Sequence, residues 1–135
     1  MIDPTTIEVL EECSRRSVAE NITFPEVVQR LASAGVEFYY TDLYQHRKTY
    51  YFPNGDARTI QDDLPNQPAP AIDFSADEVS SAIKKIQRGE IQYREFLRLI
   101  LAAGNATYTV YIAGKRAVYV GRNGDSYTEW FPGTR

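Results

Sequence analysis

Few side chains in this sequence have the chemistry that catalysis or metal binding requires. The chain holds one histidine, His46, in the polar stretch YQHRK, and one cysteine, Cys13, in a stretch of helical periodicity. A lone imidazole has no second one with which to hold a metal, and a cysteine in an amphipathic helix is typical of core packing. The nearest carboxylate pair, Asp62 and Asp63, lies in a proline-rich segment, and no phosphate-loop, zinc-ligand or nucleophile motif occurs. We therefore expect a protein that is not an enzyme and has neither metal nor cofactor.

Tyrosine and arginine are the residue types here that indicate binding. The chain has 10 Tyr beside 6 Phe and 1 Trp. Tyrosine rings can anchor a protein partner or stack on a planar ligand, and arginine can neutralise an anion. The candidate binding residues are Tyr40, Tyr44, Arg47, Tyr50, Tyr111, Arg116 and Tyr119. The competing interpretation is structural, because strand tyrosines are often half-exposed with a wet hydroxyl and basic clusters at turns are often solvated.

Length and charge limit the class of protein. A chain of 135 residues suits a single domain, residues 1–135, and its net charge of −3 argues against general nucleic-acid binding. No run of about 18 apolar residues is present, and the N-terminus lacks the basic and apolar regions of a secretory signal. A single cysteine excludes an internal disulfide. We expect a cytoplasmic protein without membrane contact.

The sequence matches itself at an offset of 69 residues (124 − 55, the glycines of RNGD and PNGD). At this offset residues 24–56 align with residues 93–125 without a gap. The identical pairs include Glu26/Glu95, Ala34/Ala103, Gly35/Gly104, Tyr39/Tyr108, Arg47/Arg116, Tyr50/Tyr119, Asn54/Asn123, Gly55/Gly124 and Asp56/Asp125. The pattern indicates a tandem duplication of one unit, with copies at about residues 3–60 and 74–132.

Each unit is expected to contain two helices. The first begins at Asp3 or at Thr5, which has capping-box spacing with Glu8. The same spacing, Thr23 with Glu26 and Ser75 with Glu78, predicts two further helix starts. Apolar residues with helical periodicity follow each start. The glycines at 35 and 104 are suited to end the second helix of each unit in a left-handed conformation.

After these glycines the apolar period changes from 3.6 to 2, which predicts strands. The Asn-Gly pairs predict type I′ hairpin turns that lead into short third strands. Because a sheet of this size is too small to stand alone, we expect the two α-α-β-β(-β) units to share one antiparallel sheet, with helices packed on one face. The fold class is therefore α+β, and the proline-rich residues 61–73 form the linker between the units.

The strand pattern divides the expected sheet into two faces. We expect the helix-packed face to hold Tyr39, Thr41, Leu43, Thr49, Tyr51, Tyr108, Val110, Ile112, Val118 and Val120. The opposite, Tyr-rich face is expected to hold Phe38, Tyr40, Asp42, Tyr44, Tyr50, Thr107, Thr109, Tyr111 and Tyr119. The sequence leaves open whether the linker covers this second face.

The stretches DLYQHRKTYY and PNGD, followed by IQRGEIQYREFLRLILAAG and YTVYIAGKRAVYVGRNGD, carry a resemblance to a known family. The chain resembles the YdfO-like (YbcV-like) bacterial and prophage domain of unknown function, whose members are sometimes labelled phage envelope proteins. The resemblance runs over nearly the whole chain and is densest from about residue 81 to 132. It implies a small, duplicated, cytoplasmic α+β protein without an established activity, and it supplies no catalytic residues.

Two functions follow from these observations as hypotheses. The first is a non-enzymatic protein-interaction module that uses the Tyr-rich face. The alternative is a small-molecule or nucleotide-binding protein with a cleft between the two repeats, where tyrosines and arginines hold an anionic ligand. Binding of single-stranded nucleic acid is disfavoured by the acidic charge. Pairing of exposed edge strands makes a homodimer possible.

Overall fold

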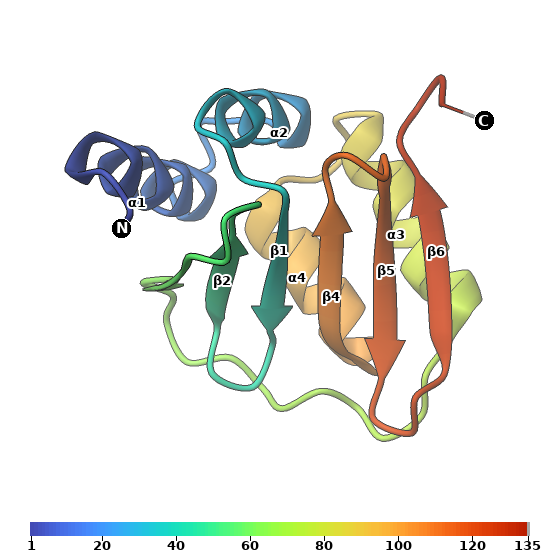
Figure 1. Cartoon of the computed structure of the whole chain (residues 1–135). Coiled ribbons are helices and arrows are strands. Elements are labelled where there is room, and N and C mark those ends of the chain that lie inside the picture. The colour runs from blue at the N-terminus through green and yellow to red at the C-terminus, as the bar shows by residue number, and fades with distance from the viewer. Residues whose placement is uncertain (135) are drawn as a thin grey trace.

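The computed structural model of the chain describes residues 1–134 and has an α+β fold (Figure 1). The elements are α1 (Pro4–Val18), α2 (Phe24–Ser33), β1 (Phe38–Asp42), β2 (Arg47–Tyr51), β3 (Ala57–Gln61), α3 (Ala76–Gln87), α4 (Tyr93–Ala102), β4 (Asn105–Tyr111), β5 (Arg116–Gly121) and β6 (Ser126–Trp130). The order helix, helix, strand, strand, strand therefore occurs twice. The predicted fold class is confirmed, whereas the descent of the halves from one duplicated unit remains a prediction.

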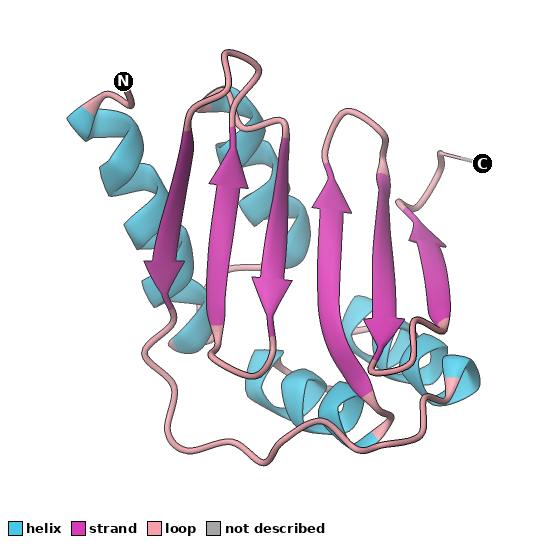
Figure 2. Ribbon diagram, turned by 60° about the horizontal axis from the view of Figure 1, so that its bottom comes forward, coloured by secondary structure: helices cyan, strands magenta, loops and turns pink. Residues whose placement is uncertain are grey.

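The six strands form one antiparallel sheet in the order β3-β2-β1-β4-β5-β6. The halves meet at the centre, where β1 pairs with β4 and Tyr40 lies opposite Thr109, 69 residues further along the chain. Figure 2 shows the helices on one face of this sheet, as expected. The apolar residues of both halves pack into one core beneath that face.

The predicted helix starts are confirmed by their hydrogen bonds. Asp3 caps α1 by accepting from the Thr5 N–H at 3.1 Å, and Ser75 caps α3 by accepting from the Glu78 N–H at 3.1 Å. Thr23 and Glu26 form a reciprocal capping box at α2. These side chains satisfy N–H groups that have no partner within the helix, and such caps contribute about 1 kcal/mol each.

The Asn-Gly turns differ from the prediction. A type I′ turn needs positive φ at both central residues, but only Gly55 (φ 95) and Gly124 (φ 89) have it, and Asn54 and Asn123 do not. The Gly55 N–H donates to the Phe52 carbonyl at 3.0 Å, which leaves a three-residue connection with one left-handed glycine. The predicted third strands, β3 and β6, follow these turns as expected.

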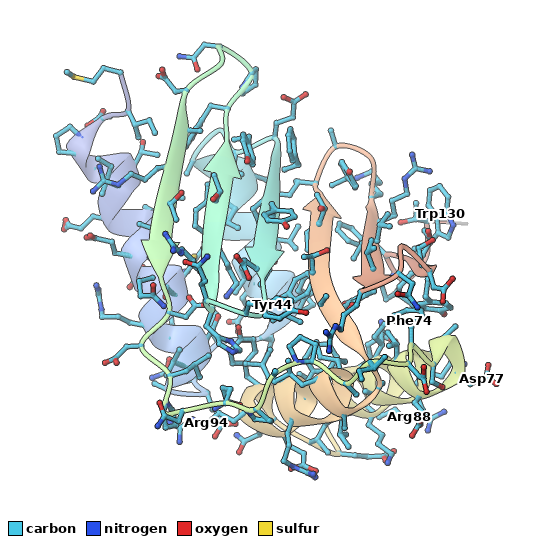
Figure 3. All side chains as sticks on the ribbon, turned by 90° about the horizontal axis from the view of Figure 1, so that it is seen from below. Tyr44, Phe74, Asp77, Arg88, Arg94 and Trp130 are labelled. Atoms are coloured by element: carbon cyan, nitrogen blue, oxygen red, sulfur yellow. The ribbon has the colours of Figure 1, made fainter. Side chains whose placement is uncertain are left out.

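The linker packs against the end of α4 and the end of β5, and leaves the face without helices uncovered. The Ala71 N–H donates to the Leu101 carbonyl at 3.0 Å, and Phe74 lies against Gly121. Gly121 belongs to the helix-facing set of β5, so Phe74 is inserted on the side of the core. Figure 3 shows this segment running along the end of the sheet, with Phe74 beneath the strands of the second half.

Gly104 is predicted to be far less tolerant of substitution than Gly35, its counterpart in the first half. Both have positive φ (86 and 92), but a Cβ at Gly104 would lie 2.1 Å from the carbonyl oxygen of Asp73, whereas a Cβ at Gly35 would meet nothing within 4 Å. We expect Gly35→Ala to lower the free energy of unfolding by about 1–2 kcal/mol through backbone strain alone. Gly104→Ala should cost at least about 2 kcal/mol more, because the linker must also move. Urea denaturation of both variants measures the difference, and equal losses would contradict it.

Candidate functional site: the open face of the sheet

The face of the sheet without helices is organised in three rows that run across the strands. Strand register places Ala57, Tyr51, Phe38, Tyr111, Arg116 and Trp130 in the first row. The second row is Thr59, Thr49, Tyr40, Thr109, Val118 and Thr128, and the third is Gln61, Arg47, Asp42, Thr107, Val120 and Ser126. We call Tyr51, Phe38, Tyr111, Arg116 and Trp130 the aromatic row.

The side chains of the aromatic row stack on one another. The Phe38 ring lies 4.6 Å from the Tyr51 ring at an interplanar angle of 13°, and 5.7 Å from the Tyr111 ring at 28°. The Arg116 guanidinium lies 4.8 Å from the centre of the Trp130 ring. Spacings near the ~4.8 Å between neighbouring strands mean that these groups stand upright and stack sideways. Their edges, and not their flat faces, therefore point toward solvent.

This face is accessible along all three rows. None of its residues is buried, and Tyr40 and Tyr111 each keep 37% of their surface exposed. In contrast, the inward-facing side chains of the four inner strands are buried. Within residues 1–134, no helix lies over the open face, as Figure 2 shows. An exposed sheet face with several large aromatic rings is a surface suited to a partner.

The charges of the open face are predominantly positive. Arg47 and Arg116 are both exposed. The one acidic residue of the three rows, Asp42, uses its carboxylate to accept from the N–H groups of Tyr44 (2.8 Å) and Gln45 (3.1 Å). Asp42 therefore holds the turn after β1, while the two arginines remain available to an anionic group.

Two of the predicted binding residues were assigned to the wrong face. Tyr50 and Tyr119 are 1% and 7% exposed and pack in the core, each beside another tyrosine. Conversely, the open face holds four residues that were expected in the core: Thr49, Tyr51, Val118 and Val120. The wrong assignment comes from the length of the two hairpin loops. Residues 43–46 form the first loop and place Asp42 opposite Arg47. Residues 112–115 form the second and place Tyr111 opposite Arg116. This register puts Tyr50 on the same face as Tyr39.

Each of these loops closes with a residue in the left-handed conformation, His46 (φ 54) in the first and Lys115 (φ 57) in the second. Lysine does not signal positive φ in a sequence, and histidine, although enriched there among residues with a Cβ, still adopts it uncommonly. The neighbouring glycine of the second loop, Gly114, is not the residue with positive φ. The sequence therefore gave no direct sign of the register across the hairpins.

The remaining predicted residues are exposed but do not form one cluster. Tyr111 and Arg116 belong to the aromatic row, and Tyr40 lies beside it in the second row. Arg47 lies in the third row, and Tyr44 is 52% exposed in the turn at that end of the strands. Figure 3 shows Tyr44 and Trp130 well apart. Three members of the aromatic row, Tyr51, Phe38 and Trp130, were not among the candidates, although Phe38 was expected on this face.

A buried polar cluster lies on the helix side of the first half. Lys48, which is 6% exposed, contacts the carboxylate of Asp62 and donates to the Tyr93 hydroxyl at 2.9 Å. Ser14 donates from Oγ to the same carboxylate at 2.6 Å. Desolvation acts to lower the pKa of Lys48, but Tyr93 and Asp62 outweigh it, so that the pKa is raised well above its usual value. Both carboxylate oxygens and the ammonium have partners inside the core, which indicates a structural role.

Asp62, which the sequence places beside Asp63 in the linker, is 4% exposed. Cys13 is also buried, and burial raises the pKa of its thiol, which is unfavourable for a nucleophile. Among residues 1–134, no three His, Cys, Asp or Glu side chains are grouped to hold a metal ion. No helix in the same range has the length and apolar character needed to cross a membrane.

Comparison with known proteins found no matching family model and no matching curated protein. The resemblance to the YdfO-like domain therefore stays a prediction.

Proposed function

We propose that the protein is a non-enzymatic, cytoplasmic interaction module that binds a protein partner through the open face of its sheet. The observation that carries the proposal is the aromatic row, in which three stacked rings and an arginine–tryptophan pair lie side by side on one face, all of them at least partly exposed. Aromatic residues and arginine are enriched among the residues that contribute most to protein–protein binding. Because the rings are already ordered by stacking, little side-chain entropy is lost when a partner covers them.

The orientation of the rings favours a protein over a nucleic acid. Bases stack on the flat faces of aromatic side chains, but the faces of Phe38 and Tyr51 are turned toward each other, 4.6 Å apart. The net charge of −3 also opposes binding to a phosphate backbone. The exposed ring edges are suited to pack between the side chains of a protein surface.

The size of the face favours a modest interface. With ~4.8 Å between strands and ~3.3 Å per residue, six strands of about five residues span roughly 29 by 17 Å. The flat outline of this face, roughly 490 Å², is below the ~800 Å² of accessible surface that each partner of a standard stable complex buries. A transient partner or a small domain fits this area.

The alternative of a small molecule or nucleotide in a cleft between the halves has no supporting observation. The halves meet through the β1–β4 ladder, in which five residues of β1 pair with β4. Two cavities of about 380 and 390 Å³ lie away from this junction, one between α1 and β3 and one on the surface of α3. The bacterial or prophage origin likewise stays a prediction.

The test is co-purification with a tagged protein from bacterial lysate treated with nuclease. We expect one protein to co-purify stoichiometrically with the wild type and to be lost with Tyr40→Ser/Tyr111→Ser, which removes the two exposed rings of the central strands. The matched control is Ile72→Ser, which removes an apolar side chain that is 67% exposed in the linker and should leave the partner bound.

Retention of the same partner by Tyr40→Ser/Tyr111→Ser would contradict the proposed site. Sedimentation of the purified protein shows whether the partner is a second copy of the chain. A dimer that forms through the open face would be present in the wild type and in Ile72→Ser, and absent in Tyr40→Ser/Tyr111→Ser.

A further inference from the structure

The strand β3 has main-chain groups that are free to pair. It is an edge strand, bonded on one side to β2. The Asp62 N–H donates to the His46 carbonyl and the Phe52 N–H donates to the Asp56 carbonyl, which sets the alternation of the ladder. Residues 58 and 60 therefore direct their main-chain groups toward β2, and Thr59 and Gln61 direct theirs to the outer edge. Edge groups of this kind can accept a further strand.

An open surface hollow of about 380 Å³ lies between this edge and α1. Thr59 and Gln61 line it from β3, and four charged side chains surround it: Glu11 and Arg15 from α1, Arg58 from β3, and Asp63. In the described part of the chain none of these four makes an ion pair or a side-chain hydrogen bond. The groove therefore combines free main-chain groups with unpaired charges of both signs.

The equivalent place in the second half is closed. At the offset of 69, Glu11 corresponds to Ser80 and Arg58 corresponds to Tyr127. The Tyr127 hydroxyl bridges the gap, since it lies 3.2 Å from Ser80 Oγ and donates to Glu129 at 2.8 Å. In the first half this bridge is replaced by two charged residues that do not touch. The two halves thus have the same arrangement of helix and edge strand. In the second half a side-chain hydrogen bond joins the helix to the strand, and in the first half no such bond is present among the described residues.

We propose that the groove between α1 and β3 binds an extended peptide segment of another protein, which adds to β3 as a seventh strand. Main-chain hydrogen bonds to Thr59 and Gln61 would supply affinity, and side chains directed at α1 would supply specificity, as in other cases of strand addition. This site is separate from the open face, so a test of the groove does not depend on the proposed function of that face.

The charges of the groove define the peptide. Successive side chains of a strand alternate between faces, so residues i and i+2 of the peptide, about 6.8 Å apart, point toward α1 together. Arginine forms paired hydrogen bonds with a carboxylate, and Glu11 and Asp63 attract a cation. The preferred segment therefore carries one acidic and one basic residue at positions i and i+2.

A second copy of this chain is a poorer occupant of the groove. Figure 2 shows α1, the helix that begins at the N-terminus, lying behind β3 and beyond the edge of the sheet. Two copies joined edge to edge would bring two α1 helices, each lying beyond the edge of its own sheet, into the same space. A single extended strand fits beside the helix without bringing a second helix with it.

The test uses a set of labelled heptapeptides whose background sequence alternates threonine and valine. In each peptide one glutamate and one lysine replace two residues at positions i and i+2. The set covers every value of i and both orders of the two charges. Fluorescence anisotropy is expected to show saturable binding to the wild-type protein, which weakens when the two charges are on adjacent residues. Thr59→Pro should weaken binding about tenfold or more, because proline removes the outward N–H and a lost hydrogen bond of about 1.4 kcal/mol is a factor of ten. The matched control is Thr128→Pro, the equivalent position on the β6 edge, which should bind like the wild type.

A second variant guards against loss of fold in the proline variants. Glu11→Ser/Arg58→Tyr transplants the closed contact of the second half into the first, and should abolish binding while the circular dichroism spectrum is unchanged. The proposal is overturned if no peptide of the set binds the wild type at about 1 mM, a concentration that detects binding of about −4 kcal/mol. It is equally overturned if Thr59→Pro and Thr128→Pro, both folded, bind with the same affinity.

Discussion

Replacing Asp62 with alanine is expected to lower the free energy of unfolding by about 3–5 kcal/mol, because a buried charge would lose its partner. The Lys48 ammonium is 6% exposed and its counter-charge comes from Asp62. Without that carboxylate the ammonium must be buried uncompensated or lose its proton, and both are costly. Ser14 would also lose the acceptor of its 2.6 Å hydrogen bond. Urea denaturation at pH 7 measures the loss.

Two controls separate this effect from a general sensitivity of the segment. Asp63→Ala changes the neighbouring carboxylate, which is exposed and unpaired among residues 1–134, and should shift stability by no more than about 0.5 kcal/mol. Lys48→Met/Asp62→Ala removes both charges and should be more stable than Asp62→Ala alone. Equal losses for Asp62→Ala and Asp63→Ala would show that the pair contributes nothing.

Stability is expected to fall steeply above pH 10. Burial raises the pKa of Tyr39, Tyr50, Tyr93 and Tyr119 well above the usual value. Above pH 10 these phenols ionise in the unfolded chain but stay protonated in the folded protein, so the folded state holds more protons and its stability declines as pH rises. Each tyrosine contributes a slope of about 1.4 kcal/mol per pH unit. The raised pKa of Lys48 acts in the same direction, because the folded state keeps a proton that the unfolded chain releases.

Urea denaturation between pH 8 and 11 measures this slope. Tyr50→Phe removes one buried phenol and should reduce the slope by about 1.4 kcal/mol per unit. Tyr44→Phe, which removes the hydroxyl of a tyrosine that is 52% exposed, is the matched control. A wild-type stability that stays constant from pH 8 to 11 would contradict the burial of these hydroxyls.

The sequence by itself determined the features that depend on neighbours along the chain. The helix starts at Asp3, Thr23 and Ser75 were predictable because a capping side chain bonds to an N–H two or three residues away. The left-handed glycines 35 and 104 were predictable because glycine alone adopts that conformation freely. The element order and the α+β class follow from such local signals and from the change of apolar period.

Only the tertiary structure decided which face each strand residue occupies. A change of one residue in the register of a hairpin moves every side chain of a strand to the other face. Here the register depends on positive φ at His46 and Lys115, which the residue types alone do not predict. Tyr50 and Tyr119 therefore lie in the core, and the aromatic row replaces the predicted site. The cluster of Lys48, Asp62 and Ser14 was also invisible in the sequence, because contacts between residues 48 positions apart exist only once the core has formed.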